Sequence, residues 1–190
     1  MKKFISFLKK GTGIYLIIAF ALMGVYALVM ATPCAALLQY EDTIHFYDAI
    51  EPYNDGILYF ALAGLFLALN YKVFRNDERN VYYLSNFLYF GVALAFLVAS
   101  VIYLIMGVSF YQGQYSQLPF EDINNYFASI QLTKSVNPFD PVFLFGYLIA
   151  GLLALGFVSL VLVFVDGIKE RLAYNQRRKD GTGATLQEVK

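Results

Sequence analysis

Apolar stretches without charge alternate with short polar segments along the chain, and four of the apolar stretches are long enough to cross a bilayer. They lie near residues 13–32, 56–74, 84–108 and 141–165. A helix needs about 20 residues to cross the hydrocarbon layer, and the second stretch reaches this length only if Lys72 extends to the interface. None of the four has a polar stripe at helical spacing, which is typical of helices surrounded by lipid. The pattern predicts an all-α integral membrane protein with four transmembrane helices.

Two polar segments that lie between these stretches resemble each other. Residues 40–50 read YEDTIHFYDAI and residues 120–130 read FEDINNYFASI, so that a Glu-Asp pair, several aromatic positions and a final isoleucine recur. Internal duplication is a common way of building membrane folds. We therefore expect two tandem hairpin repeats in parallel orientation, each with a short amphipathic outer helix.

The basic residues predict the topology. Of the 14 Lys and Arg residues, all but Lys134 fall before the first stretch, from Lys72 at the end of the second stretch to Arg79, or after the fourth stretch. Because Lys and Arg are enriched in cytoplasmic loops, we expect both termini in the cytoplasm and the protein in a plasma or inner membrane. The expected parts are a basic cytoplasmic segment 1–12, a first hairpin 13–74 with outer loop 33–55, a cytoplasmic loop 75–83, a second hairpin 84–166 with outer loop 109–140, and a basic, partly disordered tail 167–190.

Composition excludes several classes of function. The 190 residues are 59% hydrophobic with a net charge of zero, so nothing indicates a nucleic-acid partner. The single cysteine, Cys34, excludes an internal disulfide, and one histidine excludes haem ligated by two histidines of one subunit. No ionisable residue lies in the middle of a stretch, and the motifs HExxH, GxSxG and the P-loop are absent. We expect neither an enzyme nor a cofactor.

Glu41, His45 and Asp48 form a weak candidate metal site, because their spacing puts them on one face of a helix. The same spacing is also typical of the solvent-exposed polar face of an amphipathic helix. The second segment has Asn125 in place of the histidine and Ala128 in place of the aspartate, so the ligand set does not recur. We therefore interpret the three residues as the solvent-exposed face of an amphipathic helix and not as a metal site.

The recurring acidic pairs have two interpretations. Glu41, Asp42, Glu121 and Asp122 could steer a basic partner or cations toward the outer face. Alternatively, they start helices, because acids in the first turn complement the helix dipole and Pro119 is a typical start signal. Both interpretations predict helices that begin at these pairs.

Small residues recur at intervals of four in three of the apolar stretches, which lets the backbones of membrane helices approach closely. We expect these strips to pack inside the bundle, with self-association as the alternative. The strips are Gly64 and Ala68; Gly91, Ala95 and Ala99; and Gly146, Ala150 and Ala154.

Together these patterns favour a non-enzymatic membrane protein that acts as a subunit or accessory partner of a larger membrane assembly. One alternative is an oligomeric, cation-preferring channel whose mouth is lined by the acidic outer loops. A weaker alternative is a carrier of lipids or small molecules, with a cavity among the 16 tyrosines and 18 phenylalanines. The expected partners are membrane lipids and other membrane subunits or further copies of the chain.

Overall fold

The computed structural model describes residues 2–32, 40–75, 84–133, 135–137 and 141–179, and this part of the chain is helical without strands. Four of its helices are long and apolar enough to span a membrane, which confirms the predicted membrane architecture. Each of the four predicted stretches lies within one of these long helices, except that α1 ends one residue before the end of the first stretch. The five helices are α1 (Lys2–Ala31), α2 (Glu41–Arg75), α3 (Leu84–Tyr115), α4 (Phe120–Ser129) and α5 (Pro141–Lys179).

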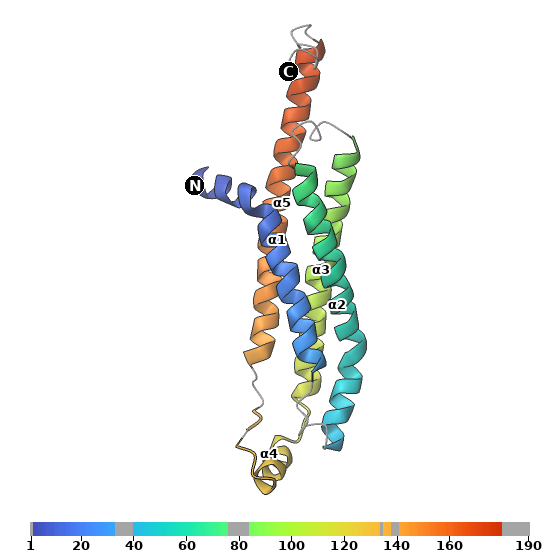
Figure 1. Ribbon diagram of the computed structural model, residues 1–190, viewed down its shortest axis with the longest axis vertical. Helices are drawn as coiled ribbons and strands as arrows, with labels where there is room; N and C mark the ends of the chain where they lie inside the picture. Colours follow the sequence, from blue (N-terminus) through green and yellow to red (C-terminus); the bar gives the residue numbers. More distant parts are fainter. Residues whose placement is uncertain (1, 33–39, 76–83, 134, 138–140, 180–190) are drawn as a thin grey trace.

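The four long helices form one bundle in which each helix packs on two neighbours. α1 contacts α2 and α5, and α3 contacts the same two helices from the opposite side. The start of α1 and the end of α5 lie at one end of the bundle, here called the terminal end (Figure 1). The short helix α4 lies at the other end, here called the α4 end (Figure 1). The first turns of α1 bend away from the bundle, whereas α5 continues beyond the other helices.

Charged side chains of α5 contact the neighbouring helices α1 and α3 at the terminal end. The Lys9 ammonium of α1 forms a salt bridge with the Asp166 carboxylate of α5. Nearby, the Arg171 guanidinium lies over the Phe87 ring of α3, 4.9 Å from its centroid. Cation–π contacts of this kind are worth about 0.5–1 kcal/mol at exposed sites.

Buried positions recur every three or four residues along each long helix, as in left-handed helix bundles. The stripe on α2 runs without interruption from Thr43 to Tyr71, and its side chains meet those of α1 and α3. Its members are Thr43, Phe46, Ile50, Asn54, Ile57, Ala61, Gly64, Ala68 and Tyr71.

The polar segment 41–50 is helical, but it forms the first turns of α2 and is not a separate outer helix. The expectation of a separate short outer helix in this segment is therefore wrong, while residues 33–39 of the predicted outer loop 33–55 lie outside the described part. α2 continues through Pro52, which lies on the exposed side of the helix and cannot donate an N–H to the Asp48 carbonyl oxygen one turn earlier. From Glu41 to Asp55 the helix advances about 21 Å at 1.5 Å per residue.

The second polar segment does form a short amphipathic helix, α4. Pro119 occupies its N-cap position, and Ile123 and Phe127 are completely buried. The helix ends in a Schellman arrangement, in which the N–H of Leu132 donates to the carbonyl oxygen of Phe127 at 2.9 Å. Gln131 takes the left-handed conformation that this ending requires, with φ of 58°.

The small-residue strips divide between buried and exposed positions. Gly64 and Ala68 on α2, and Gly146 and Ala150 on α5, are buried in the bundle. The α3 strip faces outward, as does Ala154, so the expected packing inside the bundle does not occur there. In α3 the larger residues Leu97, Leu104 and Val108 occupy the core instead. The outward strip is Gly91, Ala95 and Ala99.

Candidate functional site

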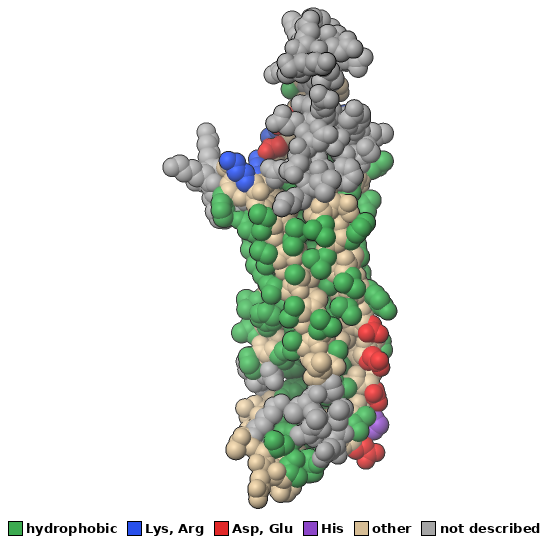
Figure 2. Space-filling view, in the orientation of Figure 1, with side chains coloured by type: hydrophobic (Ala, Val, Ile, Leu, Met, Phe, Trp, Pro, Cys, Tyr) green, Lys and Arg blue, Asp and Glu red, His purple; other side chains and the backbone are tan. Residues whose placement is uncertain are grey.

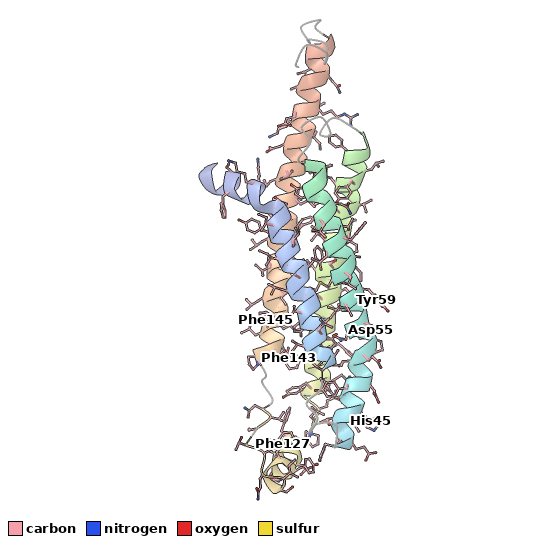
Figure 3. All side chains as sticks on the ribbon, in the orientation of Figure 1. His45, Asp55, Tyr59, Phe127, Phe143 and Phe145 are labelled. Carbon is pink, nitrogen blue, oxygen red and sulfur yellow. The ribbon has the colours of Figure 1, made fainter. Side chains whose placement is uncertain are left out.

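Four acidic side chains and one histidine follow one side of α2 where it approaches the α4 end. All five are exposed, and at about 100° per residue they fall within roughly one third of the helix circumference. Figure 2 shows the red and purple side chains gathered along this edge, and Figure 3 shows His45, Asp55 and Tyr59 projecting to the same side. We call this surface the acidic face; it consists of Glu41, His45, Asp48, Glu51 and Asp55.

The acidic face has no positive partner within the described part of the chain. The only salt bridge there joins Lys9 and Asp166 at the terminal end. Four carboxylates on about 21 Å of helix therefore create a negative potential that no positive side chain in the described part of the chain pairs with. This potential would attract a cation or a basic segment that approaches the α4 end.

A polar groove adjoins the acidic face, between the start of α2 and the end of α3. Its volume is about 380 Å³, which is at the lower end of the range for small-molecule sites. The groove is lined by Asp42, His45 and Phe46 of α2, Gln114 of α3, and Gln117, Leu118 and Pro119 of the following turn.

Backbone hydrogen bonds hold the turn that closes the groove. The N–H of Gln117 donates to the Gln114 carbonyl oxygen at 3.2 Å, and the N–H of Leu118 donates to the Tyr115 carbonyl oxygen at 3.1 Å. The N–H of Phe120 then donates to the Leu118 carbonyl oxygen at 2.9 Å. α3 thus passes into α4 through a hydrogen-bonded connection, which fixes one wall of the groove.

An aromatic cluster supports the floor of the groove. Phe46 is buried, and its ring packs edge-on against Tyr115 with 5.8 Å between the centroids. Tyr115 in turn makes edge-on contacts with Phe120 and Phe143. Edge-on pairs of this kind add stability beyond their buried area, so these contacts stabilise the floor of the groove.

Tyr40 brings the two acidic pairs together. Its ring lies 6.1 Å from that of Tyr126 on α4, centroid to centroid. Burial raises the pKa of the Tyr40 phenol above its ordinary value of 10, and the carboxylates of Asp122 and Asp42 raise it further. The fold therefore places one acid from each predicted pair close to the same phenol, although the two acids are far apart in the sequence. Both pairs also lie in the first turn of their helices.

The structure gives no support to the weak metal site at Glu41, His45 and Asp48. Among the described residues, no three His, Cys, Asp or Glu side chains are grouped closely enough to hold a metal ion. The three side chains lie on successive turns of an exposed helix face, and no described residue joins them in a metal-binding group. His45 instead lines the polar groove together with Asp42.

Sequence reasoning missed the two glutamines of the groove. Gln114 and Gln117 lie where the third apolar stretch gives way to a loop, in a segment without charge or a recognisable motif. They meet Asp42 only because α2 and α3 pack side by side. No local pattern in the sequence indicates that contact.

A small cavity lies between the long helices in the described part of the chain. This cavity, lined by Leu16, Phe20, Ala68, Tyr71 and Phe96 among others, has a volume of only about 10 Å³. Space of that size holds about one water molecule. It offers no room for a lipid or a comparable small molecule.

No protein-family model matches the chain, and neither the curated proteins nor the solved structures include a significant match.

Proposed function

We propose that the protein is a non-enzymatic accessory subunit of a membrane assembly and that the acidic face of α2 docks a basic segment of its partner. The observation that carries this proposal is the row of exposed acids from Glu41 to Asp55 on α2, for which the described part of the chain provides no positive partner. Charge complementarity of this kind speeds association and excludes partners of the wrong charge.

The proposal assigns the α4 end to the outer side of a plasma or inner membrane. The Lys and Arg residues near the helix ends cluster toward the terminal end, and such clusters favour the cytoplasmic side. We also propose that the two hairpins arose by tandem duplication in parallel orientation. The shared Glu-Asp pair, which opens a helix in both halves, supports this origin.

An oligomeric, cation-preferring channel is the second candidate, and the outward strip of α3 favours it. Gly91 has open space where a Cβ would lie, and Ala95 and Ala99 are exposed beside it. Backbones of two copies could approach closely along such a strip. A pore would then form between copies, because buried apolar side chains of the described helices occupy the core of one chain.

Photo-crosslinking tests the proposed docking. A photoreactive amino acid replaces Asp48 or Asp55 in the native membrane, and Val92, exposed on α3, serves as the control position. We expect one discrete adduct from the acidic positions, with the crosslinked peptide of the partner rich in Lys and Arg. We expect no such adduct from position 92.

Salt and flux measurements complete the test. High salt should abolish the adduct, because a Debye length of about 3 Å at 1 M screens exposed charges. Absence of an adduct at both acidic positions would refute the docking. Cation flux through liposomes that contain only this protein would support the channel instead.

A further inference from the structure

We infer that the polar groove binds an arginine side chain, presented by a basic extracytoplasmic segment of the partner. This inference rests on the proposed docking and names the group that anchors it. The groove and the acidic face are adjacent, because His45 belongs to both.

The lining of the groove offers acceptors for a cation with several N–H donors. Asp42 provides a carboxylate from α2, and the side-chain oxygens of Gln114 and Gln117 provide neutral acceptors from the facing wall. A guanidinium carries five N–H donors in a fixed plane, so it can bond to both walls at once. A lysine ammonium presents its three donors from a single atom, so it matches acceptors on two opposite walls less well.

The apolar part of the lining suits the stem of the same side chain. Phe46, Leu118 and Pro119 provide hydrocarbon surface next to the acceptors. Arginine buries its methylene groups along such surface while its charged head stays with polar partners. The volume of about 380 Å³ accommodates one long side chain and some water.

Two observations favour a polypeptide over a free cation as the source of the guanidinium. The carboxylate of Asp42 is enough to balance the single positive charge of one bound guanidinium. Beyond it, the acidic face continues along α2 through Asp48 and Glu51 to Asp55, with no positive partner in the described part of the chain. A basic segment with one arginine in the groove can pair its further basic residues with these acids, whereas a small cation cannot.

Binding of defined peptides to the purified full-length protein in nanodiscs of neutral lipid tests the inference. The probes are hexa-arginine, hexa-lysine, hexa-citrulline and arginine amide, with affinity measured by calorimetry at low salt. Citrulline keeps the shape of arginine but carries no charge. We expect hexa-arginine to bind more tightly than hexa-lysine, and we expect neither hexa-citrulline nor arginine amide to bind measurably.

Two single substitutions separate the groove from the rest of the acidic face. Asp42→Asn should weaken hexa-arginine binding about tenfold, because it removes the carboxylate that lines the groove together with the neutral acceptors Gln114 and Gln117. Asp55→Asn removes the same charge from an open position, so we expect a loss of about threefold at most. Thermal unfolding in detergent checks that both variants are folded.

A gain-of-function variant keeps the test decisive if Asp42→Asn should fail to fold. Gln114→Glu places a second carboxylate in the groove with almost no change of shape. It should tighten hexa-arginine binding and leave hexa-citrulline binding unchanged. An unchanged or weaker affinity for hexa-arginine would overturn the inference.

The outcomes distinguish this inference from the proposed docking. Equal losses for Asp42→Asn and Asp55→Asn, with crosslinking to a basic partner intact, would refute the arginine site alone. Binding of arginine amide as tight as that of hexa-arginine would identify a small guanidinium ligand and overturn the polypeptide source. No peptide binding, together with no crosslinked partner, would refute both proposals.

Discussion

Asn54 of α2 donates a hydrogen bond from its side-chain nitrogen to the backbone carbonyl oxygen of Ala27 on α1, over 2.9 Å. Its side-chain oxygen accepts a bond from the Tyr111 hydroxyl of α3 at 3.4 Å. One buried amide therefore connects three helices of the bundle. It fixes the register of the turns of α2 that lead to the acidic face.

We expect Asn54→Ala to lower the free energy of unfolding by about 1–2 kcal/mol, because the variant loses a buried hydrogen bond between helices. Unfolding in mixed detergent, followed by circular dichroism, measures the loss. Asn70→Ala is the matched control, since Asn70 lies on the same helix and bonds only to the Phe66 carbonyl oxygen one turn earlier. Equal losses for the two variants would contradict a special role for Asn54.

Gly64 and Gly91 should respond in opposite ways to the same substitution. A Cβ at position 64 would lie 2.2 Å from the Phe20 ring, which is buried against Phe96, so Gly64→Ala should destabilise by about 1–3 kcal/mol. At position 91 the Cβ would meet open space, so Gly91→Ala should be neutral or stabilise by up to about 1 kcal/mol. Thermal unfolding of both variants in one detergent tests this difference. A destabilised Gly91→Ala variant would instead indicate that the α3 strip packs on another copy or on a partner.

The number of spanning helices could be predicted from the sequence, but the faces by which they pack could not. A helix that is apolar all round gives no periodic signal of its buried side, so small residues were the only guide. Small residues indicate the packed face correctly on α2, where the Phe20 ring lies against Gly64. They fail to do so on α3, where Leu97 and Leu104 fill the core and the small strip faces outward.

The two polar segments, 40–50 and 120–130, also differ in how much of their structure the sequence predicts. α4 is predictable, because Pro119 starts it and its buried positions have helical spacing. The continuation of α2 through Pro52 is not, because it depends on a buried stripe that crosses from a polar into an apolar segment. The polar groove is less predictable still, since Gln114 and Asp42 line the same groove only through the packing of α2 on α3.

Thr12 and Ser159 should be energetically coupled across the interface of α1 and α5. Their hydroxyl oxygens lie 2.5 Å apart, and both side chains are fully buried. A double-mutant cycle with Thr12→Val and Ser159→Ala should give a coupling of about 0.6 kcal/mol, and at most about 1.7 kcal/mol, the range found for hydrogen bonds between membrane helices. Chemical unfolding of the four proteins provides the measurement. Strictly additive losses would show that the two hydroxyls do not support each other.

The segment that follows α4 should depend on a single asparagine. The Asn124 side-chain nitrogen donates to the Val136 carbonyl oxygen at 3.0 Å, and the Val136 N–H donates to the Asn124 side-chain oxygen at 2.8 Å. This pair of bonds holds residues 135–137 against α4, whose Ile123 and Phe127 are buried. We expect Asn124→Ala to release that segment while α4 stays folded on its apolar face, at a cost of about 1–2 kcal/mol for the two bonds.

Hydrogen exchange with mass spectrometry measures this release directly. In Asn124→Ala, the peptide that contains Val136 should exchange faster by about tenfold, because each 1.4 kcal/mol of lost protection corresponds to a factor of ten. Asn125→Ala is the control, since Asn125 is the exposed neighbour on the same turn of α4. Peptides from α2 should be unchanged in both variants. If the Asn125 variant exchanges as fast as the Asn124 variant at Val136, the general stability of α4, and not the Asn124 side chain, holds the segment in place.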